Sequence, residues 1–293
     1  MRKGIFYLSA LFIASTLFTA CSDDDNDNPS ETISLNISGL EDLGDDFVYE
    51  GWIIVDGSAI TTGVFTVNAE GSLSQTEFEV DKDDLDAAST FVLTIEPAVG
   101  DDPAPSDVHI LAGDFNSNTA NLSIGHGAAL ADDFTNAAGK YILATPTDGE
   151  NNNETSGIWF LEITNDGPVA GLDLPSLPSG WAYEGWAVID GTPVSTGVFT
   201  ETSGMDGSSI YSGSMAGPPF PGEDFIINAP AGLTFPTNLQ GGTAVISIEP
   251  VPDNSPNPFL LKPLVGQINS EAVDHLTYDL GQNLAFPTGS ASK

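Results

Sequence analysis

The sequence predicts an all-β protein made of two related Ig-like β-sandwich units in tandem. Residues 47–67 read FVYEGWIIVDGSAITTGVFTV and residues 181–201 read WAYEGWAVIDGTPVSTGVFTE, so 11 of 21 aligned positions are identical. Internal similarity of this extent indicates a duplicated structural unit. The chain also holds 31 Gly and 20 Pro. This composition suits many short strands joined by turns, and no segment shows a sustained helical period.

Each copy of the repeat reads as a strand, a turn and a second strand. Aromatic and β-branched residues fill 48–55, and Asp56-Gly57 is a strong hairpin signal. Gly63 is expected at a bulge or a close backbone approach. Trp52 is expected to anchor the core, with a partner for its indole N–H. The repeated residues, for which we expect a structural role, are Tyr49, Glu50, Trp52, Asp56, Gly63, Tyr183, Glu184, Trp186, Asp190 and Gly197.

A second matched block lies downstream of each copy. Residues 91–97 read FVLTIEP and residues 244–250 read AVISIEP, and each block leads into a Pro-rich turn and a short apolar strand ending in Gly. The first blocks are 134 residues apart (186 − 52) and the second blocks 153 (250 − 97), so the second unit contains a 19-residue insertion within about 202–242. This insertion is either a variable surface loop or a recognition surface built on Met205, Tyr211, Met215 and Phe220.

This order of motifs resembles the extracytoplasmic domain of anti-sigma-K factors. The shared pattern is a Tyr-x-x-Trp strand, a Gly-containing hairpin, a strand ending in Glu-Pro, a Pro-containing turn and a strand ending in Gly, over about 47–115 and 181–268. The resemblance implies a β-sandwich on the far side of the membrane from the sigma factor, with a role in envelope signalling. In that family a separate cytosolic domain with a His and Cys zinc cluster holds the sigma factor, whereas this chain has one Cys.

Residues 1–20 are predicted to be a lipoprotein signal peptide. Arg2 and Lys3 precede an apolar run that ends with a small residue just before Cys21. We expect cleavage before Cys21 and acylation of this residue, which would anchor the protein to the outer membrane; a plain secretory signal is the alternative. Residues 21–31 are predicted to be an acidic flexible tether. Their acidic run resembles the surface-export signal of Bacteroidetes lipoproteins, so we expect exposure at the cell surface.

The remaining chain is divided into unit one, 32–137, and unit two, 138–293. In unit one, residues 81–88 read equally well as a helical turn or an acidic loop. Unit two is expected to begin with a linking hairpin formed by 139–144 and 157–163. The loop of this hairpin offers Asp148, Glu150 and Glu154 as weak candidates for calcium ligands; an exposed polar loop is the alternative interpretation.

The composition restricts the possible partners and chemistry. A net charge of −36, with 6 Lys and Arg against 42 Asp and Glu, excludes nucleic acid. One Cys and the scattered His109, His126 and His275 form no zinc motif, and neither a nucleophile elbow nor a phosphate loop occurs. We therefore expect no cofactor and no enzymatic activity. The predicted function is a binding or sensing module with a membrane anchor and an envelope protein partner; the alternative is a calcium- or glycan-binding surface module.

Overall fold

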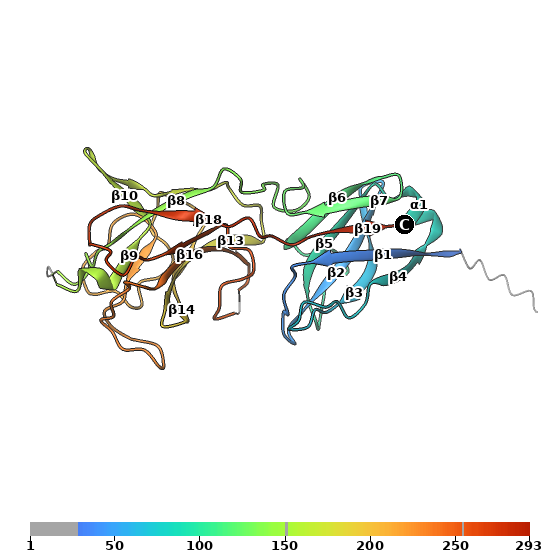
Figure 1. The fold of residues 1–293 in the computed structure, drawn as a ribbon. Coiled ribbons are helices and arrows are strands. Elements are labelled where there is room, and N and C mark those ends of the chain that lie inside the picture. The colour runs from blue at the N-terminus through green and yellow to red at the C-terminus, as the bar shows by residue number, and fades with distance from the viewer. Residues whose placement is uncertain (1–28, 150–151, 254) are drawn as a thin grey trace, which may run out of the picture.

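The described residues form strands and very little helix, as the sequence predicts. The computed structural model describes residues 29–149, 152–253 and 255–293. Within these ranges, two large antiparallel sheets form two tandem β-sandwich-like units, which lie end to end (Figure 1). None of the helices there is long and apolar enough to cross a membrane. The predicted signal peptide, Cys21 and the tether up to residue 28 lie outside the described residues.

The first unit is an 8-stranded antiparallel sheet in the order β3-β2-β5-β6-β7-β19-β1-β4. Its strands are β1 (Ser30–Ser38), β2 (Phe47–Val55), β3 (Ser58–Phe65), β4 (Glu77–Asp81), β5 (Thr90–Pro97), β6 (His109–Asn116), β7 (Thr119–Ser123) and β19 (Thr288–Ser292). In β1, Ile33, Leu35 and Ile37 are buried and the residues between them are exposed. This alternation places one face of the strand on the core.

The sheet of the first unit curls so that its two ends meet over one core. Strands β3 and β4 stand at opposite ends of the strand order. Nevertheless, Phe65 of β3 packs on Phe78 of β4, with ring centroids 6.2 Å apart. Tyr49 of β2 stacks on Phe65 at 5.6 Å. Buried aromatic pairs of this kind contribute strongly to core stability, and here they hold three strands around a single interior.

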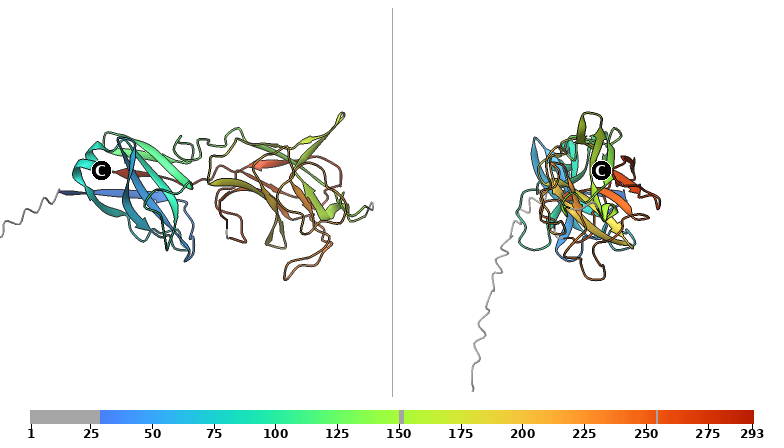
Figure 2. Two further views of the ribbon diagram at one scale, coloured as in Figure 1. Left: turned by 180° about the vertical axis from the view of Figure 1, so that it is seen from behind. Right: turned by 90° about the vertical axis from the view of Figure 1, so that its left-hand side faces the viewer.

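The last strand of the chain belongs to the first unit. In β19, Ala291 lies opposite Leu35 of β1 on one side and Ala120 of β7 on the other. Figures 1 and 2 show the red C-terminal segment running back from the second unit into the first. The prediction that 138–293 forms unit two is therefore wrong for this strand. Its sequence, TGSAS, is small and polar, so pairing on both sides, rather than any hydrophobic pattern, makes it a strand.

The predicted tether ends inside a strand. Ser30 and Glu31 pair with Asp81 and Val80 of β4, so the sheet begins before the expected start of unit one at residue 32. The start of the strand could not be recognised from its side chains, because the first residues of β1 are polar and partly or fully exposed. Their place in the sheet comes from backbone pairing, which leaves no signature in the side-chain pattern.

Residues 81–88 contain a short helix, which decides between the two interpretations of this segment. Helix α1 spans Lys82–Ala87. The carboxylate of Asp81 caps it, accepting hydrogen bonds from the backbone N–H groups of Asp83 at 2.8 Å and Asp84 at 3.2 Å. Asp is among the best N-cap residues because its side chain satisfies amides that have no partner in the first turn.

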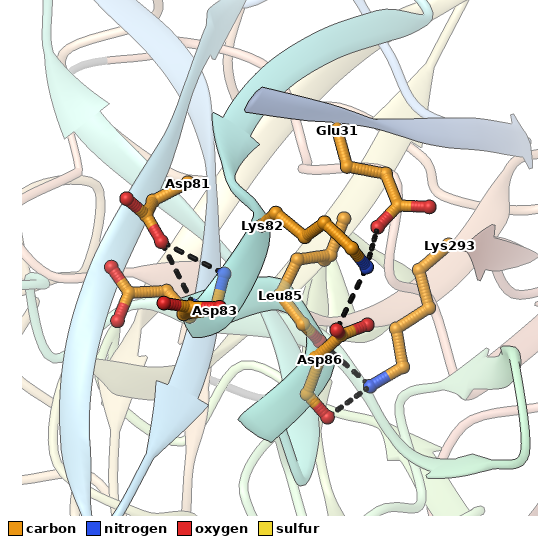
Figure 3. A network of polar contacts seen from close by, with 8 residues as sticks. Glu31, Asp81, Lys82, Asp83, Leu85, Asp86 and Lys293 are labelled. Carbon is orange, nitrogen blue, oxygen red and sulfur yellow. Dashed lines mark hydrogen bonds and ion pairs between the residues drawn. The ribbon is translucent and has the colours of Figure 1, made fainter. Parts of the chain in front are cut away.

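Two lysines hold α1 against the sheet (Figure 3). The ammonium of Lys82 contacts Glu31 of β1 at 2.9 Å and Asp86 at 2.8 Å. Lys293, which follows β19, donates to the backbone carbonyl oxygens of Leu85 at 2.8 Å and Ala88 at 3.1 Å. A cation at the C-terminal end of a helix satisfies carbonyl groups that lack partners and complements the helix dipole. The C-terminus therefore closes the first unit through both a strand and a helix cap.

The second unit repeats this plan with additions. Its 9-stranded sheet has the order β14-β13-β16-β17-β18-β8-β9-β15, with β12 paired to β8, and β10 and β11 form a separate hairpin. The elements are β8 (Ala138–Leu143), η1 (Glu154–Ser156), β9 (Gly157–Trp159), β10 (Leu161–Thr164), β11 (Gly167–Ala170), β12 (Leu172–Asp173), β13 (Trp181–Ile189), β14 (Thr192–Phe199), β15 (Gly222–Asp224), β16 (Thr243–Pro250), β17 (Leu264–Gln267) and β18 (Tyr278–Gln282). Strands β8 and β9 pair as the predicted hairpin, with Ile142 opposite Trp159.

The insertion is partly integrated into the second unit. Strand β15 pairs with β9, and Phe220 just before it is buried against Trp159 and its neighbours. Met205 and Met215 are exposed, at 68% and 57%. The interpretation of the insertion as an exposed loop therefore holds for the two methionines and is wrong for Phe220. The sequence did not reveal strand β15, because it follows a Pro-rich segment and an edge strand of three residues shows no detectable alternation.

Candidate functional site

The repeated Tyr and Trp residues face opposite sides of their sheets. Tyr49 belongs to the main core, whereas Trp52 is buried in a separate cluster with Val92, Ala112 and Ala129. Because residues three apart in a strand point to opposite faces, both cannot enter one core. The expectation that Trp52 anchors the main core is therefore wrong, although its burial is confirmed, at 2% exposure.

The core-facing tyrosines make the same contacts in both units. The hydroxyl of Tyr49 donates to the carbonyl oxygen of Glu41 at 3.0 Å, and that of Tyr183 donates to Pro175 at 2.7 Å. Each ring stacks on the phenylalanine at the end of the hairpin, Tyr183 on Phe199 at 5.7 Å. These contacts tie the segment that enters each unit to the repeat hairpin, which accounts for two of the identical positions.

A polar network occupies the other face of each repeat strand. In the first unit, the indole N–H of Trp52 donates to the Thr94 hydroxyl at 2.9 Å, and Thr94 in turn donates to the carboxylate of Glu96. Glu50 beside them accepts from the hydroxyl of Thr61. The indole of Trp52 and the hydroxyl of Thr94 thus each find an acceptor where they are buried, as buried polar groups require.

The second unit repeats the network with serine in place of threonine. Trp186 donates to the Ser247 hydroxyl at 2.7 Å, and Ser247 donates to Glu249. Glu184 accepts from the hydroxyl of Ser195. The sequence singled out the tryptophans and Glu50 and Glu184, but it missed these hydroxyl donors. The sequence did contain a signal for them. Thr94 and Ser247 stand two residues before the glutamate of the repeated Glu-Pro, which places each hydroxyl on the same face of its strand as that glutamate.

The carboxylates in this network are unusual because they are buried. Glu184 and Glu249 are 5% and 1% exposed. Burial raises the pKa of each to about 7, opposed by the hydrogen bonds that each accepts. Burial also raises the pKa of Glu50. A charged carboxylate removed from water is costly unless a cation or several donors compensate it, so burial makes these acids costly to ionise.

The repeated turn and glycine positions have clear backbone reasons. Asp56 and Asp190 have φ of 50° and 51°, and the glycine after each is also at positive φ, as two-residue hairpin turns require. Gly63 and Gly197 have φ of 126° and 131°. The strand register shifts beside both, between Gly51 and Trp52 and at the matching place in unit two. The predicted bulge is therefore confirmed in both copies.

A groove of about 670 Å³ lies where the two units meet. The first unit lines it with Glu41, Phe47 and Pro97, among others, and the second unit with Glu249, Val251 and Asp253. Ser179 of the second unit donates to the carboxylate of Asp107 of the first at 2.8 Å across the same junction. The groove combines apolar walls with carboxylates, the usual lining of a binding site.

The structure describes two of the three candidate calcium ligands of the hairpin loop, Asp148 and Glu154. Glu154 begins η1, and its carboxylate accepts a hydrogen bond from the backbone N–H of Thr145 at 3.0 Å. Glu150 lies outside the described residues. Among the residues that the structure does describe, three other acids lie closely enough to share an ion: Glu184, Glu249 and Asp253.

The histidines lie mostly against backbone groups. The Nδ1 atom of His109 lies 2.8 Å from the carbonyl oxygen of Ala128, and His126 accepts from the N–H of the same residue at 3.1 Å. His126 also approaches Asp114 at 3.4 Å. These contacts fix the loop after β7 over the strand that carries His109.

Comparison with known protein families supports the resemblance found in the sequence. Residues 26–109 match the family model described as anti-sigma-K factor rskA, C-terminal. The matched segment runs through β1 to β5 and reaches the start of β6, which is most of the first repeat unit. The comparison with curated proteins found no match, and neither did the comparison with solved structures.

Proposed function

We propose that the protein is a non-enzymatic, lipid-anchored envelope module that binds a protein partner outside the cytoplasm and takes part in envelope signalling. The match of residues 26–109 to the C-terminal domain of anti-sigma-K factors carries this proposal. The second unit extends the argument, because it reproduces the hairpin, the bulge and the Trp–hydroxyl–Glu network of the matched unit. Two copies of one module supply two related surfaces for a partner.

The groove between the units is the surface we assign to the partner. Its lining includes apolar side chains that water can reach, such as Val251 at 51% exposure. Exposed apolar groups rimmed by polar residues mark protein interaction sites. The chain's charge of −36 favours a partner whose contacting surface is basic.

The lipid anchor belongs to the same proposal. An apolar run that ends in a small residue before the chain's single Cys supports acylation of Cys21. The acyl chains would hold the module at the outer membrane, and the acidic segment after Cys21 supports export to the cell surface. Replacing Cys21 with Ala should release the protein from the membrane fraction, which fractionation of cells would detect.

Crosslinking on intact cells tests the partner directly. The full-length protein is crosslinked, purified, and its partners identified by mass spectrometry. We expect an envelope or regulatory protein that is lost in Val251→Asp, which places a charge in the groove. Val169→Asp is the matched control, because Val169 is similarly exposed, at 43%, on β11, away from the groove lining. Recovery of no protein partner would contradict the proposal.

A calcium- or glycan-binding surface module is the second candidate function. The observation that favours it is the combination of carboxylates and apolar walls in the groove. Oxygen ligands suit a hard cation, and carboxylates beside an apolar wall also suit a sugar. A glycan array with the purified protein, set against the crosslinking result, separates the two candidates.

A further inference from the structure

Three carboxylates converge beside the groove in the second unit. Glu184 on β13, Glu249 on β16 and Asp253 each offer an oxygen atom, and these oxygen atoms lie within 4.8 Å of one another. The sheet register explains the first two: Glu184 lies opposite Ser247 and Glu249 lies opposite Ala182. The two glutamates are therefore diagonal neighbours on one face. Asp253 joins them from the turn after β16, the strand that ends in the repeated Glu-Pro.

One oxygen of this cluster is buried without a partner. Glu184 Oε1 accepts from Ser195, but its Oε2 atom is buried and has no hydrogen-bond partner in the part of the chain that the structure describes. In contrast, both oxygens of Glu249 accept from the backbone N–H of Phe259, at 2.9 and 3.2 Å. An unsatisfied buried carboxylate oxygen is costly. Because this oxygen belongs to one of the three clustered acids, a bound cation would compensate it.

The charges around the cluster leave it unneutralised. Asp253 and Asp206 both place a further negative charge close to Glu184. Lys262 interacts electrostatically with Glu249, and it also interacts with Glu41. One partly buried ammonium shared between two acids does not balance the three carboxylates. A divalent cation would compensate them directly.

We propose that one Ca²⁺ ion binds per chain at Glu184, Glu249 and Asp253. The donor set is all oxygen, which suits a hard cation and disfavours zinc, whose usual ligands are nitrogen and sulfur. Asp253 is exposed, so water can complete the irregular, high-coordination shell that Ca²⁺ accepts more readily than Mg²⁺. This proposal rests on the calcium-binding candidate function and does not depend on the proposed protein partner, because it concerns the purified chain.

The first unit supplies a natural contrast. Its corresponding acids are Glu50, Glu96 and Asp101, yet they do not form a close group of ligand oxygens among the described residues. Glu50 accepts a hydrogen bond from the Thr61 hydroxyl, and Glu96 accepts from Thr94 and from the backbone N–H of Ser106. The repeat therefore keeps the acids in both units, while among the described residues three of them offer oxygen atoms within 4.8 Å of one another only in the second unit.

Calorimetric titration of the purified full chain with CaCl₂ tests the site. We expect one ion per chain, with a Kd in the range of extracellular calcium modules, about 10⁻⁴–10⁻³ M. A saturating concentration of CaCl₂ should raise the Tm of the second unit by about 5 °C, because only the folded chain binds the ion. Glu184→Gln should weaken binding by more than about tenfold. Glu50→Gln is the matched control and should leave the affinity unchanged.

Three results would overturn the proposal. The first is the absence of both binding heat and a Tm shift at several times the expected Kd. The second is Glu184→Gln protein that is folded and binds Ca²⁺ as tightly as the unmodified chain. The third is an equal loss of affinity in Glu50→Gln, which would place the ion elsewhere. Folding of each variant is checked by the near-UV signal of its tryptophans before titration.

Discussion

Leu35 in the first strand of the sheet lies directly opposite Ala291 in the last strand of the chain. Ala291 is fully buried, and β19 is paired on both sides, to β1 and to β7. The first unit is therefore complete only when the end of the chain is present. The second unit, in contrast, is built from residues that are contiguous in the sequence between β8 and β18.

Removal of residues 287–293 should destabilise the first unit selectively. Without β19, the strands β1 and β7 lose their shared neighbour and become unpaired edges. We expect the Tm of the first unit to fall by more than about 10 °C, while amides of β13 and β16 retain their hydrogen-exchange protection. Lys293→Ala is the control: it keeps β19 and removes the cap on α1 and the contact of the ammonium with the Phe115 ring, at a cost of about 1 kcal/mol. Equal loss of protection in both units would contradict this prediction.

Replacing the hydroxyl partners of the buried tryptophans should be costly in both units. Thr94→Val and Ser247→Ala each leave an indole N–H without an acceptor, with an expected loss of about 1–3 kcal/mol. Denaturant unfolding followed by tryptophan fluorescence measures the change. In the double variant Trp52→Phe, Thr94→Val, no indole N–H is left without an acceptor. The stability lost in this double variant should therefore be smaller than the sum of the losses in the two single variants. Strict additivity would show that the hydrogen bond contributes nothing.

Stability in the presence of a chelator should decrease from about pH 5 to pH 8. Burial raises the pKa of Glu184, Glu249 and Glu223 to about 7, from 4.5. Between these values the folded chain binds more protons than the unfolded chain. The stabilisation is therefore complete below pH 4.5 and is lost as the pH rises through 7. Thermal melts across this range provide the measurement.

Glu184→Gln separates this effect from general repulsion among the many acids. An amide does not titrate, so the variant should show a shallower decrease of Tm with pH than the unmodified chain. Added CaCl₂ should flatten the same profile in the unmodified chain and leave the Glu184→Gln profile unchanged. Parallel profiles for the two proteins in chelator would mean that Glu184 titrates near its ordinary value.

The bulge glycine should tolerate no side chain. A Cβ atom at Gly63 would lie 2.9 Å from Cδ1 of Phe78, in the core, at a φ of +126°. Gly57 also has a positive φ, +81°, but a Cβ there would meet open space. Gly63→Ala should therefore cost about 1–3 kcal/mol more than Gly57→Ala, the difference being overpacking. Urea unfolding of the two variants tests this, and equal losses would assign the whole cost to the backbone.

The repeat allowed much of the fold to be predicted. The strand at Tyr49, the turn at Asp56 and the bulge at Gly63 follow from local chemistry: β-branched and aromatic runs, a dipeptide that accepts positive φ, and a glycine at a close approach. Finding each feature twice made each interpretation firmer. The same reasoning placed Trp52 in the main core, because it followed residue type and ignored the odd spacing from Tyr49.

The sequence by itself determined the all-β class, the duplication and the identity of the repeated residues, because these depend on neighbours along the chain. Only the tertiary structure decided that Thr288–Ser292 completes the first sheet and that Glu184, Glu249 and Asp253 meet. Both arrangements depend on which strands become neighbours in space. Backbone pairing of small polar residues leaves no hydrophobic pattern in the sequence. With 42 Asp and Glu residues in the chain, nothing in the sequence distinguishes the acids that strand register brings together.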